Sequence, residues 1–555
     1  MSLHVRLISS RHKCFHNMSA DSFECLKSGT MLRNDLFCFE ALLDSDKDCR
    51  IRLNLISELA PYTRVFRIES VHVALPTYEQ NTDSDYLNNK QPGLYPDLML
   101  PYVPGDFLEL KAGQALSVWL EIHTPEDLPA GEYPVTVSVN GASAQSLAHA
   151  SLSLDVIPAV LPEQRLIYTQ WLHCDCLATY YHVEPFSDTH WQIVENFVRA
   201  AAENGVNMLL MPLFTPPLDT AVGGERPTVQ LVGVTYDTAA KTYAFDFRLV
   251  DRWLSMCERC GIRYHEATHL FTQWGAEHAP KIMATVDGVY KRIFGWETDS
   301  LSEEYLSFVK QFLAAFKAYL RGRGLLEKTM FHLSDEPNSE HLERYKKLRE
   351  ALAEGLEGCT CGDALSNYEF YKTGAVQRPI VAIDHIEPFL SHHTPHLWGY
   401  QCCSQHQKVS NRFIAMPMNR TRMIGIQLFK YRLEGFLQWG CNFYYSQYSA
   451  RELNPYECND GGGWVPAGDA FSLYPGPDGI PYPSLHMLAF TQALYDLRAF
   501  ELLASLTSHE ETVALTDGMA GSPITFTDYP REEDFAERVR ETVNRRIGSL
   551  CARKP

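Results

Sequence analysis

The chain has 555 residues, of which 45% are hydrophobic and 21% charged, a composition that indicates a soluble globular protein and excludes disordered and fibrous classes. Its 49 Lys and Arg residues against 68 Asp and Glu give a formal charge of -19, which disfavours binding to nucleic acid or to anionic membranes. Residues 1–20 contain no apolar signal-peptide core, and no later stretch reaches the ~18 uninterrupted apolar residues of a membrane span. With 15 cysteines that fit reduced thiols, the sequence predicts a cytoplasmic protein.

Residues 1–162 have the pattern of a β-sandwich. Short runs with alternating apolar residues, such as RIRLNLI, ALSVWLEIH and YPVTVSV, are separated by turn residues. Pro158 and Pro162 then stiffen a short connection to a region with a different rhythm. We therefore predict an N-terminal sandwich domain that ends near residue 162.

Residues 163–500 repeat a helical segment, a glycine and an apolar strand. Gly205, Gly261 and Gly324 stand where a left-handed residue would end each helix, and VNMLLMPLF, IRYHEATHLF and TMFHLS follow as strands. Five further runs bring the number of strands close to eight, which predicts a (β/α)8 TIM barrel. The alternative is a doubly wound open sheet, whose usual Gly-rich phosphate turn is absent. Residues 501–555 are predicted to form a C-terminal extension with a charged helix that packs on the barrel.

The predicted strand ends are rich in aromatic, amide, histidine and carboxylate side chains. In a barrel the active site lies at these carboxyl ends, and Trp or Tyr rings can stack on sugar faces while polar groups hold hydroxyls. The predicted substrate-binding residues are Trp171, His269, Trp274, His278, His332, Asn367, Tyr368, Trp398, Tyr400, Trp439, Asn442, Tyr444 and Asp469. The alternative for each tryptophan is a place in the barrel core.

The adjacent acids Asp335 and Glu336 come directly after the fourth predicted strand and before Pro337. Neighbouring strand residues point to opposite faces, so the pair cannot easily bracket a sugar as acid and direct nucleophile. If the substrate carries a 2-acetamido group, its own carbonyl oxygen can attack the anomeric carbon. The protein then needs only an acid and a carboxylate that orients the amide. The alternative is that the two acids merely begin a helix.

Three segments resemble glycoside hydrolase family 123, the β-N-acetylgalactosaminidases: HLFTQWGAEHAPKIMA, FHLSDEPN and GDAFSLYPGPDGIPYPSLHMLAFTQALYD. The resemblance spans most of the chain and implies a β-sandwich before a barrel. It also implies substrate-assisted catalysis, with Asp335 as the orienting carboxylate and Glu336 as the acid/base, and a β-linked N-acetylgalactosamine as the sugar. The chain departs from the family pattern at His486, Leu488 and Ala493, where the family has Arg, Glu and Gly, whereas Asp496 matches.

The peptide HEATH at residues 265–269 matches the zinc-protease pattern HExxH, which binds zinc only on a helix. Because Gly261 ends the preceding helix and this segment reads as a strand, we predict no metal and no cofactor. The remaining alternatives are a β-hexosaminidase acting on N-acetylglucosamine, a retaining glycosidase that uses Asp384 or Glu266 as a second carboxylate, and a non-catalytic carbohydrate-binding protein.

The sequence therefore predicts an exo-acting glycoside hydrolase that removes a terminal β-linked N-acetylhexosamine with retention, through an oxazoline intermediate. A cytoplasmic location favours short oligosaccharides or glycosides as substrates. The oligomeric state stays open, with a homo-oligomer among the alternatives.

Overall fold

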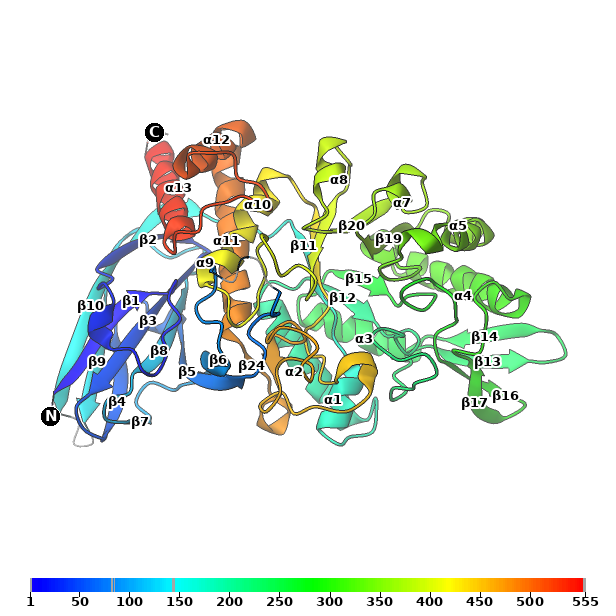
Figure 1. Cartoon of the computed structure of the whole chain (residues 1–555), viewed down its shortest axis with the longest axis horizontal. Coiled ribbons are helices and arrows are strands. Elements are labelled where there is room, and N and C mark those ends of the chain that lie inside the picture. The colour runs from blue at the N-terminus through cyan, green and yellow to red at the C-terminus, as the bar shows by residue number, and fades with distance from the viewer. Residues whose placement is uncertain (1, 81–82, 84, 142–144, 553–555) are drawn as a thin grey trace.

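The computed structural model of the protein describes residues 2–80, 83, 85–141 and 145–552. Figure 1 shows a β-rich N-terminal part in blue and cyan beside a larger part that runs from green to orange, with the C-terminal helices in red above the strands of the first part. Over the described residues, no helix combines the length and the apolar character that a membrane crossing needs.

The N-terminal part is a sandwich of two five-stranded sheets. The first sheet has the order β1 (Leu3–Ser9), β3 (Leu36–Ser45), β8 (Leu116–His123), β5 (Thr63–Val73) and β6 (Gly93–Pro101). The second has the order β2 (Ser28–Arg33), β10 (Ser146–Val160), β9 (Gly131–Gly141), β4 (Cys49–Ile56) and β7 (Phe107–Leu110). Along β9, Tyr133, Val135, Val137 and Val139 alternate with more exposed residues and are buried. The period-two pattern in the sequence is thus the inner face of this sandwich.

The second part is a closed barrel of eight parallel strands, which confirms the predicted TIM barrel and excludes the open sheet. Its strands, in order around the barrel, are β11 (Ile167–Gln170), β12 (Met208–Met211), β15 (Tyr264–Ala267), β18 (Thr329–Phe331), β19 (Thr360–Leu365), β20 (Arg378–Ala382), β21 (Trp398–Gln401) and β22 (Gly435–Gln438). The strand order follows the chain order, so every pair except the closing pair β11 and β22 joins successive barrel strands.

Helices cover the outside of the barrel. They are α1 (Cys174–Tyr180), α2 (Asp188–Glu203), α3 (Arg248–Arg259), α4 (Glu303–Gly322), α5 (Leu342–Ala351), α6 (Ala353–Leu356), α7 (Glu369–Lys372), α8 (Glu387–Ser391), α9 (Met418–Arg422), α10 (Ile424–Lys430) and α11 (Leu485–Leu506). Gly205, Gly261 and Gly324 follow α2, α3 and α4 with φ angles of 91°, 82° and 67°. These left-handed conformations favour glycine, so the three predicted helix ends are confirmed.

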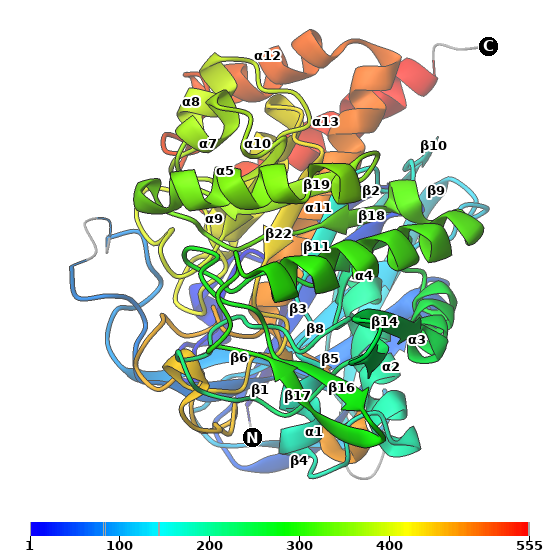
Figure 2. The same ribbon diagram turned by 90° about the vertical axis from the view of Figure 1, so that its right-hand side faces the viewer.

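Insertions between the barrel strands make this part longer than a minimal barrel. Strands β13 (Gly233–Asp237), β14 (Thr242–Asp246), β16 (Ile282–Val286) and β17 (Val289–Phe294) form a separate sheet in the order β14-β13-β16-β17. Figures 1 and 2 show this sheet at the end of the barrel farthest from the sandwich. A two-stranded ribbon of β23 (Leu473–Tyr474) and β24 (Tyr482–Pro483) precedes α11.

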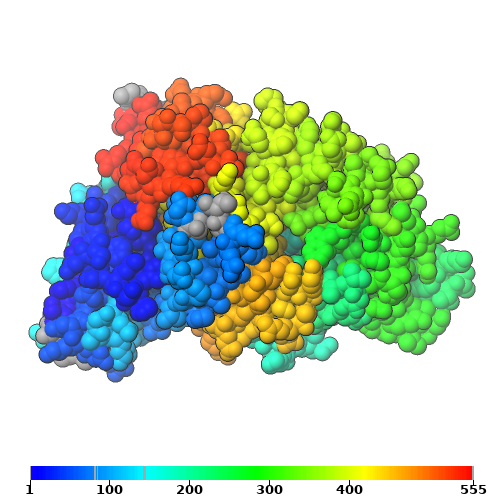
Figure 3. All heavy atoms as spheres, in the orientation of Figure 1, coloured from blue at the N-terminus to red at the C-terminus, as the bar shows by residue number. Residues whose placement is uncertain are grey.

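The C-terminal segment joins the two parts. The predicted boundary at residue 500 lies inside α11, which is followed by α12 (His509–Ala520) and α13 (Phe535–Cys551). We expected this extension to pack on the barrel, and α13 does contact α11, but it also packs against β2 and β10 of the sandwich. In Figure 3 the red C-terminal atoms lie directly on the blue N-terminal ones.

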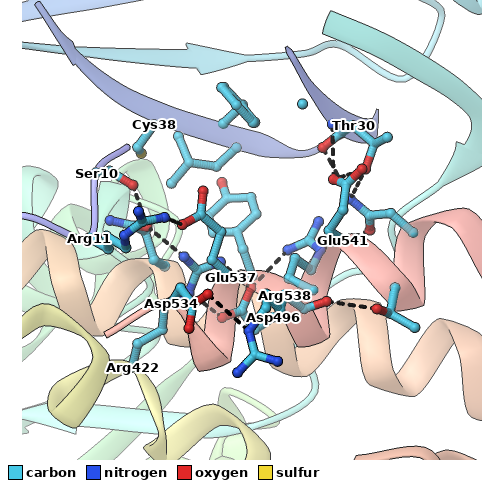
Figure 4. Close-up of a pocket in the computed structure, with 18 of the residues that line it drawn as sticks. Ser10, Arg11, Thr30, Cys38, Arg422, Asp496, Asp534, Glu537, Arg538 and Glu541 are labelled. Atoms are coloured by element: carbon cyan, nitrogen blue, oxygen red, sulfur yellow. Dashed lines mark hydrogen bonds and ion pairs between the residues drawn. The ribbon is translucent and has the colours of Figure 1, made fainter. Parts of the chain in front are cut away.

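We call the contact of α11 and α13 with the sandwich the seam. Charged side chains line a cavity of about 470 Å³ at this seam (Figure 4). Arg540 of α13 lies 2.5 Å from Asp35 of the sandwich and 3.2 Å from Asp496 of α11. Arg422 of α9 forms a second ion pair with Asp496 at 2.5 Å. Because these charges are buried and paired, loss of one partner would leave the other without compensation, so the seam holds the domains in one arrangement.

The residues that depart from the family pattern also lie at the seam. His486, at the start of α11, donates from Nδ1 to Asp97 of β6 at 2.8 Å, and its Nε2 lies 3.0 Å from the Phe471 carbonyl oxygen. Leu488 packs in an apolar cluster with sandwich residues, and the Ala493 backbone lies directly against Gly425. These departures therefore concern contacts between domains and helices, and none of the three residues lines the cavity described in the next section.

Replacing Asp97 with Asn should lower the free energy of unfolding by ~3–5 kcal/mol, because a buried partner of His486 loses its charge. Burial alone would raise the pKa of Asp97, but His486, Lys13 and Tyr474 outweigh it and hold that pKa below its usual value. This contribution is therefore present above about pH 4 and lost as the pH falls through the folded-state pKa. Chemical denaturation at pH 7 and pH 3 measures it. The control Asp48→Asn, in an exposed surface pair with Lys111, should leave the stability essentially unchanged. An equal loss in both variants would contradict the prediction.

Candidate active site

A cavity of about 270 Å³ lies at the carboxyl ends of the barrel strands. Trp171 follows β11, Asp335 and Glu336 follow β18, and Tyr400 lies within β21. The full lining is Trp171, Asp219, Gln273, Trp274, Asp335, Glu336, Ala364, Tyr400, Cys402, Cys403, Ser404, Leu437, Trp439, Gln447, Tyr448 and Trp464. Residues from seven of the eight strands or the loops after them thus converge on one volume, where a TIM barrel carries its chemistry.

Asp335 and Glu336 lie in a tight turn beyond β18. The Asp335 carbonyl accepts a hydrogen bond from the Trp274 N–H at 2.9 Å, and the Glu336 N–H donates to the Ala364 carbonyl at 3.1 Å. Glu336 has a φ of 44°, a left-handed conformation that is uncommon outside glycine. Because the chain has left the extended conformation, the strand rule of opposite faces no longer applies and both carboxyl groups line the cavity.

The helix that follows begins after the two acids. Asn338 accepts a hydrogen bond from the Glu340 N–H at 3.0 Å, and the first helical turn is Ser339–His341. The alternative, in which the acids only begin a helix, is therefore not what the fold contains. Their position in the turn has to be explained by the cavity.

Burial raises the pKa of Asp335 well above its usual range, and the negative charge of Glu336 raises it further. Burial also raises the pKa of Glu336, while hydrogen bonds from Tyr400 and Trp274 act against this rise. The Tyr400 hydroxyl donates to Glu336 Oε1 at 2.6 Å. Two adjacent carboxyl groups in one cavity share protons as a pair, and such a pair can both donate and accept a proton near neutral pH.

A buried network lies beneath the cavity. His332 Nε2 is 2.8 Å from Glu266 Oε2, and His332 Nδ1 is 3.5 Å from Asp363 Oδ1. Glu266 also accepts a hydrogen bond from the Trp171 indole at 3.0 Å, and Asp363 accepts one from the Leu333 N–H at 2.9 Å. The network thus holds the Trp171 ring on one side and the chain leading to Asp335 on the other.

Burial alone would lower the pKa of His332, but its bonds to Asp363 and Glu266 outweigh this effect and raise the pKa to about 10. The raised pKa favours a protonated His332 ring between the side chains of Glu266 and Asp363. His269 stacks on it with ring centroids 4.7 Å apart and has no hydrogen-bond partner on either nitrogen among the described residues.

His269, His332 and Asp363 are residue types that can hold a metal ion, and their ligand atoms lie within 4.8 Å of one another. Competing hydrogen bonds occupy part of this group, because His332 is bound to Glu266 and Asp363 to Leu333. The HExxH segment itself is not helical, since β15 covers Tyr264–Ala267. The ion pairs with His332 account for the group without a metal, and the absence of a metal stays a prediction.

Six of the predicted site residues besides Asp335 and Glu336 lie at or next to the cavity. Trp171, Trp274, Tyr400 and Trp439 line it, and the Trp439 indole donates to Asp469 Oδ2 at 2.9 Å just behind the wall. Tyr400 bonds an acid of the pair directly, because its hydroxyl donates to Glu336. His332 lies below the cavity, in the buried network.

The other predicted residues are placed elsewhere. His269 is buried and stacks on His332. The backbone of His278 forms an isolated antiparallel β-bridge with that of Asp299. The remaining five form structural contacts outside the cavity lining. Asn367 accepts a hydrogen bond from the Glu369 N–H, Tyr368 stacks on His392, and Trp398 is buried against Gly435. Asn442 bonds the His173 backbone, and the Tyr444 hydroxyl donates to the Leu473 carbonyl.

Sequence reasoning missed Asp219, which lies in the long loop after β12. It also missed Trp464, Tyr448 and the vicinal Cys402 and Cys403, which line the same cavity. The available signal for Asp219 was a buried strand followed by the loop TPPLD, because a polar residue soon after a barrel strand belongs to the active-site end.

A barrel of this form, with paired carboxyls and indole rings around a small cavity at its carboxyl end, defines a carbohydrate-active hydrolase. Residues 171–503 match the catalytic domain of glycoside hydrolase family 123, and the chain therefore belongs to that family. Among curated proteins, no sequence matches the chain.

A solved structure from the same family shares the fold. A family 123 glycoside hydrolase from Clostridium perfringens, studied for glycolipid glycan hydrolysis, is 13% identical to this chain with a TM-score of 0.75, and the match covers 100% of this chain and 99% of that one. A β-glucuronidase of Parabacteroides merdae is 10% identical with a TM-score of 0.30, over 90% of this chain and 52% of that one. The first likeness extends over both the sandwich and the barrel, whereas the second is too loose to compare the folds.

The His332 network should stabilise the fold in a pH-dependent way. A pKa raised to about 10 means that the contribution of His332 is fully present below the unfolded value of about 6.5 and is lost as the pH rises through 10. The stability difference between the wild type and His332→Gln, on the order of 3 kcal/mol at pH 6, should therefore shrink towards pH 10. Urea denaturation at several pH values measures it. A difference that stays constant from pH 6 to pH 10 would show that His332 is not held as an imidazolium.

Proposed function

We propose that the protein is an exo-acting β-N-acetylgalactosaminidase that works by substrate-assisted catalysis. The single observation that carries this proposal is the turn at Asp335 and Glu336, which directs both neighbouring carboxyl groups into one cavity. The Clostridium perfringens relative was studied for glycolipid glycan hydrolysis, which supports a glycan substrate. The same proposal places the protein in the cytoplasm, with short oligosaccharides and other glycosides as its substrates. The 15 free cysteines support this location, because cytoplasmic proteins rarely contain disulfides.

In the first step, Glu336 gives its proton to the glycosidic oxygen while the acetamido carbonyl oxygen of the sugar attacks the anomeric carbon. The bond to the aglycone breaks, and the aglycone leaves as a neutral alcohol. The Asp335 carboxylate accepts a hydrogen bond from the amide N–H of the sugar. Its negative charge compensates the positive charge that develops on the oxazoline ring as it forms. In the second step, the Glu336 carboxylate removes a proton from water, which opens the oxazoline with net retention.

Substrate binding decides which acid carries the proton. In the empty cavity, burial and the charge of Glu336 raise the pKa of Asp335 and so favour its protonated form. An amide N–H that donates to Asp335 favours its ionised form, and the proton then resides on Glu336. The sugar thereby produces the ionisation state that its own cleavage needs.

The size and walls of the cavity support removal of one terminal sugar. A volume of about 270 Å³ lies just below the usual range of ligand sites, which is about 300–1,000 Å³. The indoles of Trp171, Trp439 and Trp464 provide apolar surfaces for a sugar ring. Trp274 is 41% exposed and meets Tyr448 edge-on at 5.8 Å, which suits it to contact the aglycone at the mouth.

The alternative second carboxylates named from the sequence are poorly placed for direct nucleophilic attack. Glu266 is buried beneath the cavity and bonded to Trp171 and His332. Asp384 is outside the cavity lining and accepts a hydrogen bond from Gln405 at 3.0 Å. These contacts favour the substrate-assisted route over a double displacement through either residue.

Asp335→Asn and Glu336→Gln should each lower kcat/KM by ~10²–10⁴-fold on a fluorogenic β-N-acetylgalactosaminide. The measurement is aglycone release from this substrate, from the β-N-acetylglucosaminide and from the plain β-galactoside. We expect activity on acetamido sugars only, highest on the galactosaminide. The exposed Glu340 near the same turn gives a matched control, and Glu340→Gln should behave as wild type. Cleavage of the plain galactoside at a comparable rate would overturn the substrate-assisted mechanism.

Tyr400→Phe should move the alkaline limb of the kcat/KM profile to higher pH, by up to about one unit. The reason is that the Tyr400 hydroxyl favours ionised Glu336, so its removal raises the pKa of that carboxyl and keeps the acid protonated longer. The control is Tyr431→Phe, whose hydroxyl instead bonds the Ile524 carbonyl outside the cavity. An alkaline limb that moves to lower pH would contradict Glu336 as the acid.

A further inference from the structure

Asp219 is held at the cavity by its own backbone. Its N–H donates to Gln273 Oε1 at 2.7 Å, and its carbonyl oxygen accepts a hydrogen bond from Ser449 Oγ at 2.7 Å. Gln273 belongs to the loop after β15 and Ser449 to the loop after β22, so two neighbouring loops fix this residue. Its φ of 46° is left-handed, a conformation that persists only where the surroundings hold it.

The polar ends of Asp219 and Gln273 are free to bind a ligand. Gln273 uses its amide oxygen on the Asp219 backbone, and its Nε2 has no partner among the described residues although the side chain is 8% exposed. No described group donates to the Asp219 carboxylate by hydrogen bond or ion pair. Leaving a buried amide donor unpaired is unfavourable, so the arrangement is explained most simply by a ligand that completes it.

The described lining of the cavity is acidic and holds no basic side chain. Asp219, Asp335 and Glu336 line the cavity, and its described lining contains no Lys, Arg or His. The nearby Arg226 is engaged by both oxygens of Asp175 at 2.7 Å and by the Leu218 carbonyl at 3.0 Å. Burial raises the pKa of Asp219 to about 7, with Arg226 acting against the rise and the charges of Glu336 and Asp469 adding to it.

We propose that Asp219 and Gln273 form the subsite that recognises hydroxyl groups of a neutral sugar and excludes sugars with an anionic substituent. This inference rests on the proposed function and adds the substrate class. The carboxylate accepts a hydrogen bond from one hydroxyl, and the amide N–H donates to the oxygen of a neighbouring one. A sulfate or carboxylate on the sugar would meet the Asp219 carboxylate without a cation to offset it.

The test compares a fluorogenic β-N-acetylgalactosaminide with its 6-sulfate and its 4-sulfate. The wild type should favour the neutral substrate by at least about 100-fold in kcat/KM. Asp219→Asn should lose about 10- to 100-fold on the neutral substrate, because a hydrogen bond to a charged group is lost, and less on at least one sulfated substrate. The preference for the neutral sugar should therefore narrow by about tenfold.

Gln273→Glu provides the second variant. A glutamate can still accept the hydrogen bond from the Asp219 N–H, but it replaces the amide donor with a second carboxylate. Activity on the neutral sugar should therefore fall, and the sulfated sugars should be rejected more strongly. Gln311→Glu is the matched control, because Gln311 Oε1 accepts the Tyr243 N–H at 3.0 Å on the surface of α4. Thermal unfolding of each variant identifies any that fails to fold.

Three results would overturn the proposal. One is equal cleavage of neutral and sulfated substrates by the wild type. Another is an equal effect of Asp219→Asn on all substrates. The third is a loss greater than about 10⁴-fold on every substrate, which would instead assign Asp219 a direct part in bond cleavage.

A separate result would show that the proposed function itself is wrong. If the folded wild type cleaves no acetamido sugar, that function is wrong, and the subsite is then tested by calorimetric titration with free N-acetylgalactosamine and its 6-sulfate. Binding of the neutral sugar that Asp219→Asn weakens about tenfold would support the subsite. Equal binding of the two sugars, or binding of neither, would overturn it.

Discussion

The left-handed turn at Glu336 is the constraint on which the active site depends. An extended chain would send two neighbouring carboxyl groups to opposite sides of the barrel wall. Here the turn brings both into one cavity, at a conformational cost of about 1–3 kcal/mol for a residue other than glycine. Hydrogen bonds to the Trp274 N–H and the Ala364 carbonyl hold the turn, and Asp363 holds the chain just before it. The strain is thus compensated by neighbouring loops and strands of the barrel.

The sequence predicted the fold well because the fold follows from local patterns. Alternation in YPVTVSV and the repeated helix, glycine and strand are each readable over a few residues, and Gly205, Gly261 and Gly324 end helices as expected. The four-stranded sheet inserted around β15 was not predicted, because strands at the ends of long loops carry no barrel periodicity.

The candidate site was predictable only in part. Asp335, Glu336, Tyr400 and three tryptophans were predicted, and they line the cavity, because they lie in barrel strands or in the stretches soon after them. Trp398 and His332 also belong to strands or strand ends, yet they are buried inside the barrel wall, and the sequence does not say how far along the axis a side chain lies. Asp219 was missed because it reaches the cavity through a loop, where position depends on contacts with residues distant in sequence such as Gln273 and Ser449.

The seam between the sandwich and the barrel bears on how the chain folds during synthesis. The sandwich strands leave the ribosome first, but Arg540, which compensates Asp35, belongs to the last helix of the described chain. Until α13 has been made, the sandwich therefore exposes the Asp35 carboxylate and the parts of β2 and β10 that α13 later contacts. The N-terminal part would have to wait for almost the whole chain before reaching its final packing, and a ribosome that stalls late would leave this surface open to chaperones.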